Sequence, residues 1–187
     1  MPEKRPQTST SWKLIHGLPG HPLHPPLTDA TIGMFVLAAA VGVIGALGGL
    51  GDAAGEAMWL ALVGGLIAAV PTALTGLADW LTLDWGSDRW RTATVHLLLM
   101  VTSVILFAIA AWLQWSGWQD GTVTAGGLIL ALVGSGALLL GGWFGGAVVF
   151  VHGTRVLETS SPTPQAAPTA GTARFVREHV TADGRRR

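Results

Sequence analysis

Cysteine is absent from this 187-residue chain, and charged residues are scarce. Without cysteine there is no disulfide, no thiolate metal ligand, no cysteine nucleophile and no cysteine-ligated iron–sulfur cluster. Charged residues make up 12% of the chain, about half of the ~25% that is typical of soluble domains. The 11 basic residues balance the 11 acidic ones, and half of all residues are hydrophobic. This composition excludes an intrinsically disordered chain and argues against a nucleic-acid-binding protein, which carries a basic excess.

Four long stretches of the sequence contain no Asp, Glu, Lys or Arg. They cover residues 30–51, 57–78, 92–119 and 121–154. A transmembrane helix needs about 20 mainly apolar residues, and each stretch exceeds that length. We therefore predict an all-α integral membrane protein with transmembrane helices at about 27–50, 57–82, 92–115 and 123–152. Because two of the connecting loops are short, we expect an antiparallel four-helix bundle in the lipid bilayer.

The basic residues predict how the bundle is oriented. Three of them precede the first predicted helix, two lie in the middle loop and six follow the fourth helix. The positive-inside rule then places both termini in the cytoplasm and the multi-pass chain in the plasma (inner) membrane of a bacterium. We expect an N-terminal segment at 1–26, a transmembrane domain at 27–156 and a disordered, Pro-rich cytoplasmic tail at 157–187.

Histidine and aspartate recur where the predicted helices begin and end on the cytoplasmic side. The residues concerned are His21, His24, Asp29, Asp79, His96 and His152. Ionisable groups at membrane depth are costly and by default indicate a functional site. His21 and His24 each precede proline, which predicts extended rather than helical backbone at both. Asp79 ends its helix, where the helix dipole disfavours negative charge, so we expect His96 or His152 to be its partner.

The first functional hypothesis is a haem b site. Neutral imidazole ligates haem iron, and helical bundles build cofactor sites from facing helices. The first and third helices are diagonal in such a bundle, so His24 or His21 can face His96 across it. His152, at the end of a stripe of glycines on the fourth helix, is the alternative ligand. This hypothesis implies a redox partner or a larger membrane complex.

The second hypothesis is a divalent-metal site, since histidine and carboxylate together suit Zn, Fe, Cu or Ni. Its ligands would be His24, His96, His152 and Asp79, with Asp29 orienting a ligand histidine. Two non-catalytic interpretations stay open: the polar residues anchor helix ends, or the chain is an assembly or docking subunit. The sequence also leaves a homodimer open. The motifs G-x-S-x-G and H-E-x-x-H and a phosphate-binding loop do not occur, which argues against a hydrolase.

Three pieces of the sequence coincide with these positions. They are Gly20-His21-Pro22-Leu23-His24-Pro25, Thr75-Gly76-Leu77-Ala78-Asp79-Trp80, and His96. Together they resemble a bacterial family of small four-span membrane proteins of unknown function that carries an H-P-x-H-P motif, over about residues 16–157. The resemblance implies the four-helix fold. Some members resemble fusions to a Rieske iron–sulfur domain, which would imply redox work, but this chain has no cysteine and no such domain.

Overall fold

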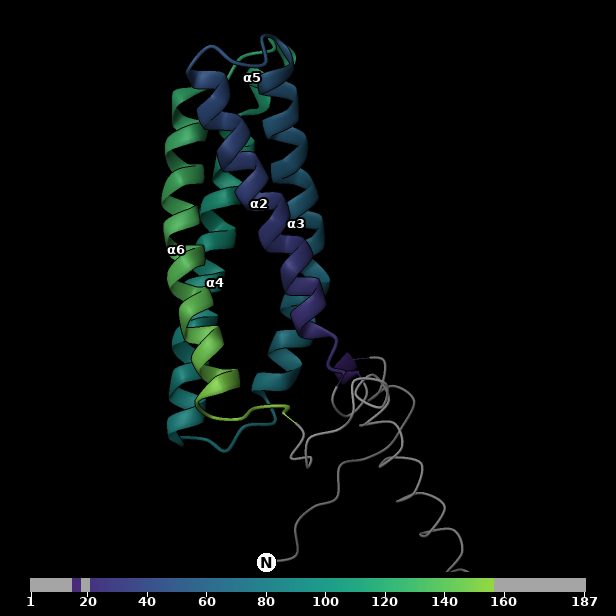
Figure 1. Ribbon diagram of the computed structural model, residues 1–187, viewed down its shortest axis with the longest axis vertical. Helices are drawn as coiled ribbons and strands as arrows, with labels where there is room; N and C mark the ends of the chain where they lie inside the picture. Colours follow the sequence, from purple (N-terminus) through teal and green to yellow (C-terminus); the bar gives the residue numbers. More distant parts are fainter. Residues whose placement is uncertain (1–14, 18–20, 157–187) are drawn as a thin grey trace, which may run out of the picture.

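Four long helices form the molecule (Figure 1). The computed structural model describes residues 15–17 and 21–156. The long helices are α2 (His24–Ala46), α3 (Ala53–Trp80), α4 (Asp88–Leu113) and α6 (Ala125–Phe150), with the short helix α5 (Trp115–Gln119) between the last two. All four are long and apolar enough to cross a membrane. The predictions for most of the N-terminal segment and for the tail fall on 1–14, 18–20 and 157–187, outside the described residues.

The long helices begin and end within four residues of the predicted positions. α4 begins earlier than its charge-free stretch because the Ser87 hydroxyl accepts a hydrogen bond from the Trp90 N–H at 3.1 Å, which caps the helix. The predicted extended backbone at His24 is wrong, since α2 begins at this residue. Pro25 and Pro26 lie in the first turn, where a missing N–H costs no intrahelical hydrogen bond.

The helices pack as two hairpins, α2 with α3 and α4 with α6. In the first hairpin, His24 lies beside Gly76 at one end and Gly45 lies beside Ala54 at the other. The two hairpins meet in the interior, where the ring of Phe35 from α2 stacks on the ring of Phe107 from α4 with centroids 3.9 Å apart. Both phenylalanines are fully buried, and the core around them is completed by residues of α3 and α6.

The two hairpins repeat one arrangement of residues. Three positions of α2 recur 72 residues later in α4, where His24, Thr31 and Phe35 correspond to His96, Ser103 and Phe107. Three positions of α3 recur 69 residues later in α6, where Gly65, Thr72 and Gly76 correspond to Gly134, Gly141 and Gly145. Equivalent side chains also meet one another across the interior. An approximate two-fold rotation therefore relates the hairpins.

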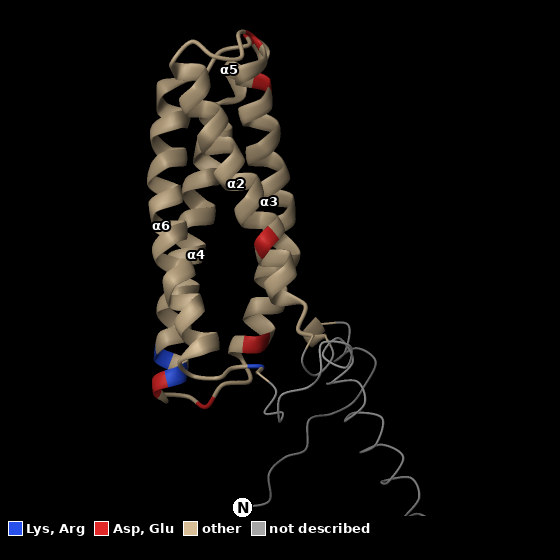
Figure 2. Cartoon of the chain, viewed as in Figure 1, with Lys and Arg blue, Asp and Glu red and all other residues tan. Residues whose placement is uncertain are grey.

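The two ends of the molecule differ in their polar residues. We call the end that carries His24 and His96 the histidine end, and the opposite end, where Gln114 is fully buried, the glutamine end. Gln114 donates to the Thr122 carbonyl at 2.8 Å and accepts from the Thr124 N–H at 3.0 Å. Among the described residues, Lys and Arg occur only at the histidine end (Figure 2).

Candidate functional site

His24 is held in one orientation by α3. Its Nδ1 lies 2.9 Å from the carbonyl oxygen of Thr72. A carbonyl oxygen only accepts hydrogen bonds, so Nδ1 carries the proton and Nε2 of the neutral ring keeps its lone pair. The Thr28 hydroxyl is 3.5 Å from Nε2, but it donates to the His24 carbonyl at 2.9 Å. Nε2 of His24 is therefore available to bind an electron-pair acceptor.

His96 is held in the same way by α6. Its Nδ1 lies 2.8 Å from the carbonyl oxygen of Gly141, which fixes the same tautomer. Each histidine thus donates to the carbonyl four residues before a glycine, Gly76 for His24 and Gly145 for His96. A hydrogen bond from the second ring nitrogen to a carbonyl is how proteins orient metal-binding histidines.

Glycine is required beside each ring. A Cβ atom on Gly76 would lie 2.6 Å from Cε1 of His24, and one on Gly145 would lie 2.9 Å from Cε1 of His96. Carbon atoms pack at about 3.5–4.0 Å, so any side chain there would push the ring away. The glycine stripe predicted on the fourth helix therefore lets α4 approach closely and makes room for a histidine.

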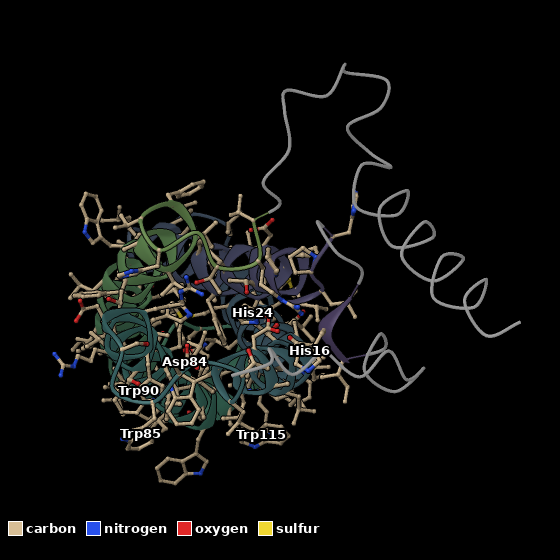
Figure 3. All side chains as sticks on the ribbon, turned by 90° about the horizontal axis from the view of Figure 1, so that it is seen from below. His16, His24, Asp84, Trp85, Trp90 and Trp115 are labelled. Carbon is tan, nitrogen blue, oxygen red and sulfur yellow. The ribbon has the colours of Figure 1, made fainter. Side chains whose placement is uncertain are left out.

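The two rings face each other across the interior. Their centroids are 6.4 Å apart and their planes are nearly perpendicular, at 85°. Seen from the histidine end, His24 lies toward the middle of the molecule, whereas Trp85 and Trp90 lie at its edge (Figure 3). The diagonal placement of the helices predicted that His24 or His21 would face His96, and the structure places His24 there. The prediction missed the carbonyls of Thr72 and Gly141, although comparing the two halves at the offsets of 72 and 69 residues reveals both positions.

The other predicted histidines are placed elsewhere. His152 follows the last residue of α6, and its Nε2 lies 2.9 Å from the hydroxyl of Thr92. His21 is exposed. The residues described here contain no group of three His, Asp or Glu side chains that could hold a metal ion. The predicted four-ligand metal set, which needed His152 and Asp79 beside the pair, is not assembled.

The partners of Asp79 differ from those that its position in the sequence predicts. Its carboxylate accepts from Arg155 Nη2 at 3.0 Å and lies 2.7 Å from Nδ1 of His16. Arg155 also donates to the His16 carbonyl at 2.7 Å. The prediction that His96 or His152 would pair with Asp79 is wrong. A signal was present, since Asp79 and Arg155 are the first charged residues after two charge-free stretches that end at the same side. We call this group the Asp79 clasp.

Asp29 does not orient a histidine within the described residues. It is the sixth residue of α2 rather than part of the first turn, and it is exposed. Hydrogen bonds or ion pairs to its carboxyl group are absent from the part of the chain that the structure describes. The predicted role of Asp29 beside a ligand therefore has no contact to support it.

A family model for a predicted membrane protein, DUF2231, matches residues 20–158, about three quarters of the chain. The chain belongs to the DUF2231 family. The matched region begins just before the His-Pro segment and includes all four long helices and both histidines of the pair. The description of DUF2231 names no activity. Neither a curated protein nor a solved structure matches the chain.

Proposed function

We propose that this DUF2231 protein binds haem b and that His24 and His96 would hold its iron. The observation that carries the proposal is the His24–His96 pair, in which each Nδ1 donates to a carbonyl and each Nε2 keeps its lone pair. When bound, a haem supplies one-electron redox chemistry, which would make the protein a redox-associated membrane subunit.

The number of histidines favours haem over a divalent metal ion. The macrocycle itself holds the haem iron, so the protein has to supply only axial ligands. A zinc ion needs about four ligands, or three in a catalytic site. His152 is hydrogen-bonded to Thr92, and Asp79 forms an ion pair with Arg155. Neither side chain is therefore placed to complete a set of metal ligands around the histidine pair.

The separation of the rings fits one metal atom held between them. Two imidazoles that each bind one metal atom at ~2 Å place their ring centres roughly 6 Å apart, and the observed separation is 6.4 Å.

In this proposal, the residues around the histidine pair orient the two rings and leave room for them. The carbonyls of Thr72 and Gly141 hold the proton-bearing Nδ1 atoms, which keeps Nε2 unprotonated. Gly76 and Gly145 leave room for the rings. The protein thus sets the ligand tautomer and orientation before any cofactor arrives, and that preorganisation strengthens ligation.

We further propose an antiparallel bundle in the plasma (inner) membrane with both termini in the cytoplasm. The distribution of basic residues supports this orientation, because Arg89, Arg91 and Arg155 all lie at the histidine end. The chain has no cysteine, so Gln119→Cys and Asp88→Cys give single labelling sites. We expect a membrane-impermeant thiol reagent to label position 119 and not position 88 in intact cells. Labelling at 88 would reverse the orientation.

The haem proposal is tested by a visible spectrum of the detergent-purified full chain. We expect an α-band after dithionite reduction and about one haem per protein. His24→Ala and His96→Ala should each remove the band. His21→Ala and His152→Ala are matched controls, and both should keep it because neither residue belongs to the pair.

Three other results would overturn the haem proposal. Stoichiometric metal without an α-band indicates the divalent-metal alternative. A clean spectrum with no metal indicates an assembly or docking subunit. Loss of the band in the His152→Ala variant but not in the His24→Ala variant moves the ligand to the segment that follows α6.

A further inference from the structure

The chain crosses the histidine end directly after α6. α3 packs on α2 and α4, and α6 packs on the same two helices, so α3 and α6 stand at opposite corners of the bundle. Yet Arg155, shortly after the end of α6, reaches Asp79 in the last turn of α3, with 3.0 Å between Nη2 and the carboxylate. Figure 1 shows the segment running from the end of α6 across the histidine end toward the side on which α3 ends. We call residues 151–155 the strap.

The strap is attached one helical turn beyond each histidine of the pair. On α3, Asp79 lies three residues beyond the glycine beside His24, which puts it on the same side of the helix and nearer its end. On α4, Thr92 lies four residues before His96, and its hydroxyl is 2.9 Å from Nε2 of His152 in the strap. The strap therefore stands between the histidine pair and the water at this end of the molecule.

Arg155 holds the backbone of the strap in an unfavourable conformation. Its φ is 63°, in the left-handed region that residues with a Cβ seldom adopt. Such a conformation persists only where surrounding contacts hold it. Nη2 of Arg155 supplies these contacts, since it donates to the Asp79 carboxylate at 3.0 Å and to the His16 carbonyl at 2.7 Å. Losing them lets the backbone of the strap relax.

The strap also buries a polar group at a cost. The hydroxyl oxygen of Thr154 is buried, and among the described residues it is the one buried side-chain nitrogen or oxygen without a hydrogen-bond partner. A buried hydroxyl without a partner destabilises the state that contains it, and water would satisfy it once the strap lifts. Thr154 thus opposes the closed arrangement, and Arg155 maintains it.

We propose that the strap is a lid over the histidine pair and that the Asp79 clasp keeps this lid closed. Opening the lid admits small water-borne ligands to the two rings, and closing it excludes water from them. Excluding water strengthens the electrostatic interactions inside a site, and solvent access tunes the properties of a bound metal. The inference concerns access to the histidines, so it holds whatever they bind.

The labelling rate of a cysteine placed beside the pair measures whether the lid is open, because the chain has no cysteine of its own. Thr75→Cys is the reporter, since Thr75 is buried and its hydroxyl lies 3.4 Å from Nδ1 of His24. Ser103→Cys is the matched control, a buried hydroxyl position seven residues beyond His96. The full chain in lipid nanodiscs is treated with a small charged thiol reagent, and labelling is followed by mass spectrometry.

We expect the Thr75→Cys chain to be labelled slowly while the clasp is intact. Arg155→Ala should raise the rate by about fivefold, or ~1 kcal/mol. Asp79→Val, which copies the residue at the equivalent position of α6, should act similarly. Asp79→Asn should raise the rate by less, because its amide oxygen still accepts from Arg155. Arg91→Ala, which removes an exposed arginine of the same end, should leave the rate unchanged.

Three results would overturn the lid. Fast labelling of Thr75→Cys with the clasp intact would show that the pair is already open to water. Equal rates with and without Arg155→Ala would show that the strap does not control access. An equal increase at Ser103→Cys would show that the whole bundle loosens. Val148→Cys, a half-buried position whose carbonyl accepts from the Thr154 N–H, is a second reporter. The readout needs no cofactor, so it stands or fails separately from haem binding.

Discussion

The α2–α3 and α4–α6 hairpins share their interior and differ at the histidine end. In each, a histidine donates to a carbonyl, and a buried phenylalanine follows 11 residues later. However, α4 extends eight residues from its histidine toward that end, whereas α2 begins at His24. In the first hairpin the rim is instead formed by the segment with His16, which Asp79 and Arg155 hold. The histidine pair therefore depends on the spacing of the ring, the carbonyl and the glycine in each hairpin. The segments that surround the pair at the histidine end can differ between the hairpins.

Truncating either stacked phenylalanine should have the largest effect and tests whether the hairpins are equivalent. Phe35 and Phe107 are fully buried and stack at 3.9 Å. Removing such a side chain costs about 3–5 kcal/mol through lost contacts and the cavity left behind. We expect Phe35→Ala and Phe107→Ala to lower the free energy of unfolding by similar amounts, measured by steric trapping in bicelles.

The Phe35→Ala/Phe107→Ala double variant tests whether the two rings stabilise each other by stacking. Each single variant already removes the stacking of the two rings, which is worth about 0.5–1.5 kcal/mol beyond burial. The double variant should therefore cost less than the two single variants together. Additive costs would mean that the rings do not stack, and a large effect from only one phenylalanine would break the equivalence of the hairpins.

Filling the glycines beside the histidines should have the next largest effect. A Cβ at Gly76 or Gly145 would lie within 3 Å of a histidine ring, and such overpacking typically costs about 1–3 kcal/mol. We expect Gly76→Ala and Gly145→Ala each to lower haem retention by roughly 10- to 100-fold, the usual cost of disturbing the orientation of a ligand. The measurement is haem transfer to an acceptor protein.

Gly142→Ala is the control for both glycine variants, since a Cβ there meets nothing within 4 Å. It should leave haem retention unchanged. If Gly145→Ala and Gly142→Ala behave alike, the close packing of His96 against α6 does not hold its ring.

The Asp79 clasp has no counterpart in the second hairpin, because α6 has Val148 at the position equivalent to Asp79. Arg155→Ala should lower the free energy of unfolding by about 1 kcal/mol, below the ~1.5–3 kcal/mol of buried charged hydrogen bonds, because a third of the Arg155 side chain is exposed. Asp79→Asn should leave haem retention unchanged, since Asp79 bonds to Arg155 and His16. A 10- to 100-fold loss in the haem-transfer assay would show that Asp79 orients a ligand after all.

The sequence predicted the four long helices because a membrane span is specified by the composition of about 20 residues. It also predicted that His24 or His21 would face His96. The sequence did not predict which residues lie at the same height along the bundle, because the prediction placed all helix ends of the cytoplasmic side at one height. His24 is the first residue of α2, yet it lies beside the ninth residue of α4. The same error put Asp29 at the rim, although it lies about 20 Å from the start of α4.

The sequence did not predict the contacts of Asp79, for a different reason. Arg155 and His16 approach Asp79 from segments 76 and 63 residues away, so their positions depend on how the chain leaves α6 and enters α2. Periodicity reports only the face of a helix, which is why it found the glycine stripes correctly. Segments outside the helices have no such periodicity, so their contacts cannot be predicted in this way.

Removing the hydroxyl groups that lie between the histidines and the phenylalanines should have the smallest effect, and it should affect the two hairpins differently. In the second hairpin the Ser103 hydroxyl donates to the Gly134 carbonyl at 2.9 Å. In the first, the hydroxyls of Thr31 and Thr72 lie 2.9 Å apart, but each also donates to a carbonyl of its own helix. Two hydroxyls have two protons for three hydrogen bonds, so the bond between the helices is made only part of the time.

Interhelical hydrogen bonds in membranes contribute about 0.6 kcal/mol on average. We therefore expect Ser103→Ala to lower the free energy of unfolding by about that amount, and Thr31→Val, which keeps the side-chain volume, to lower it by less. Steric trapping of both variants and of the Thr31→Val/Thr72→Val double variant checks the order. If Thr31→Val costs more than Ser103→Ala, the threonine pair is the main polar link between helices, and the two hairpins differ in their interior as well as at their rim.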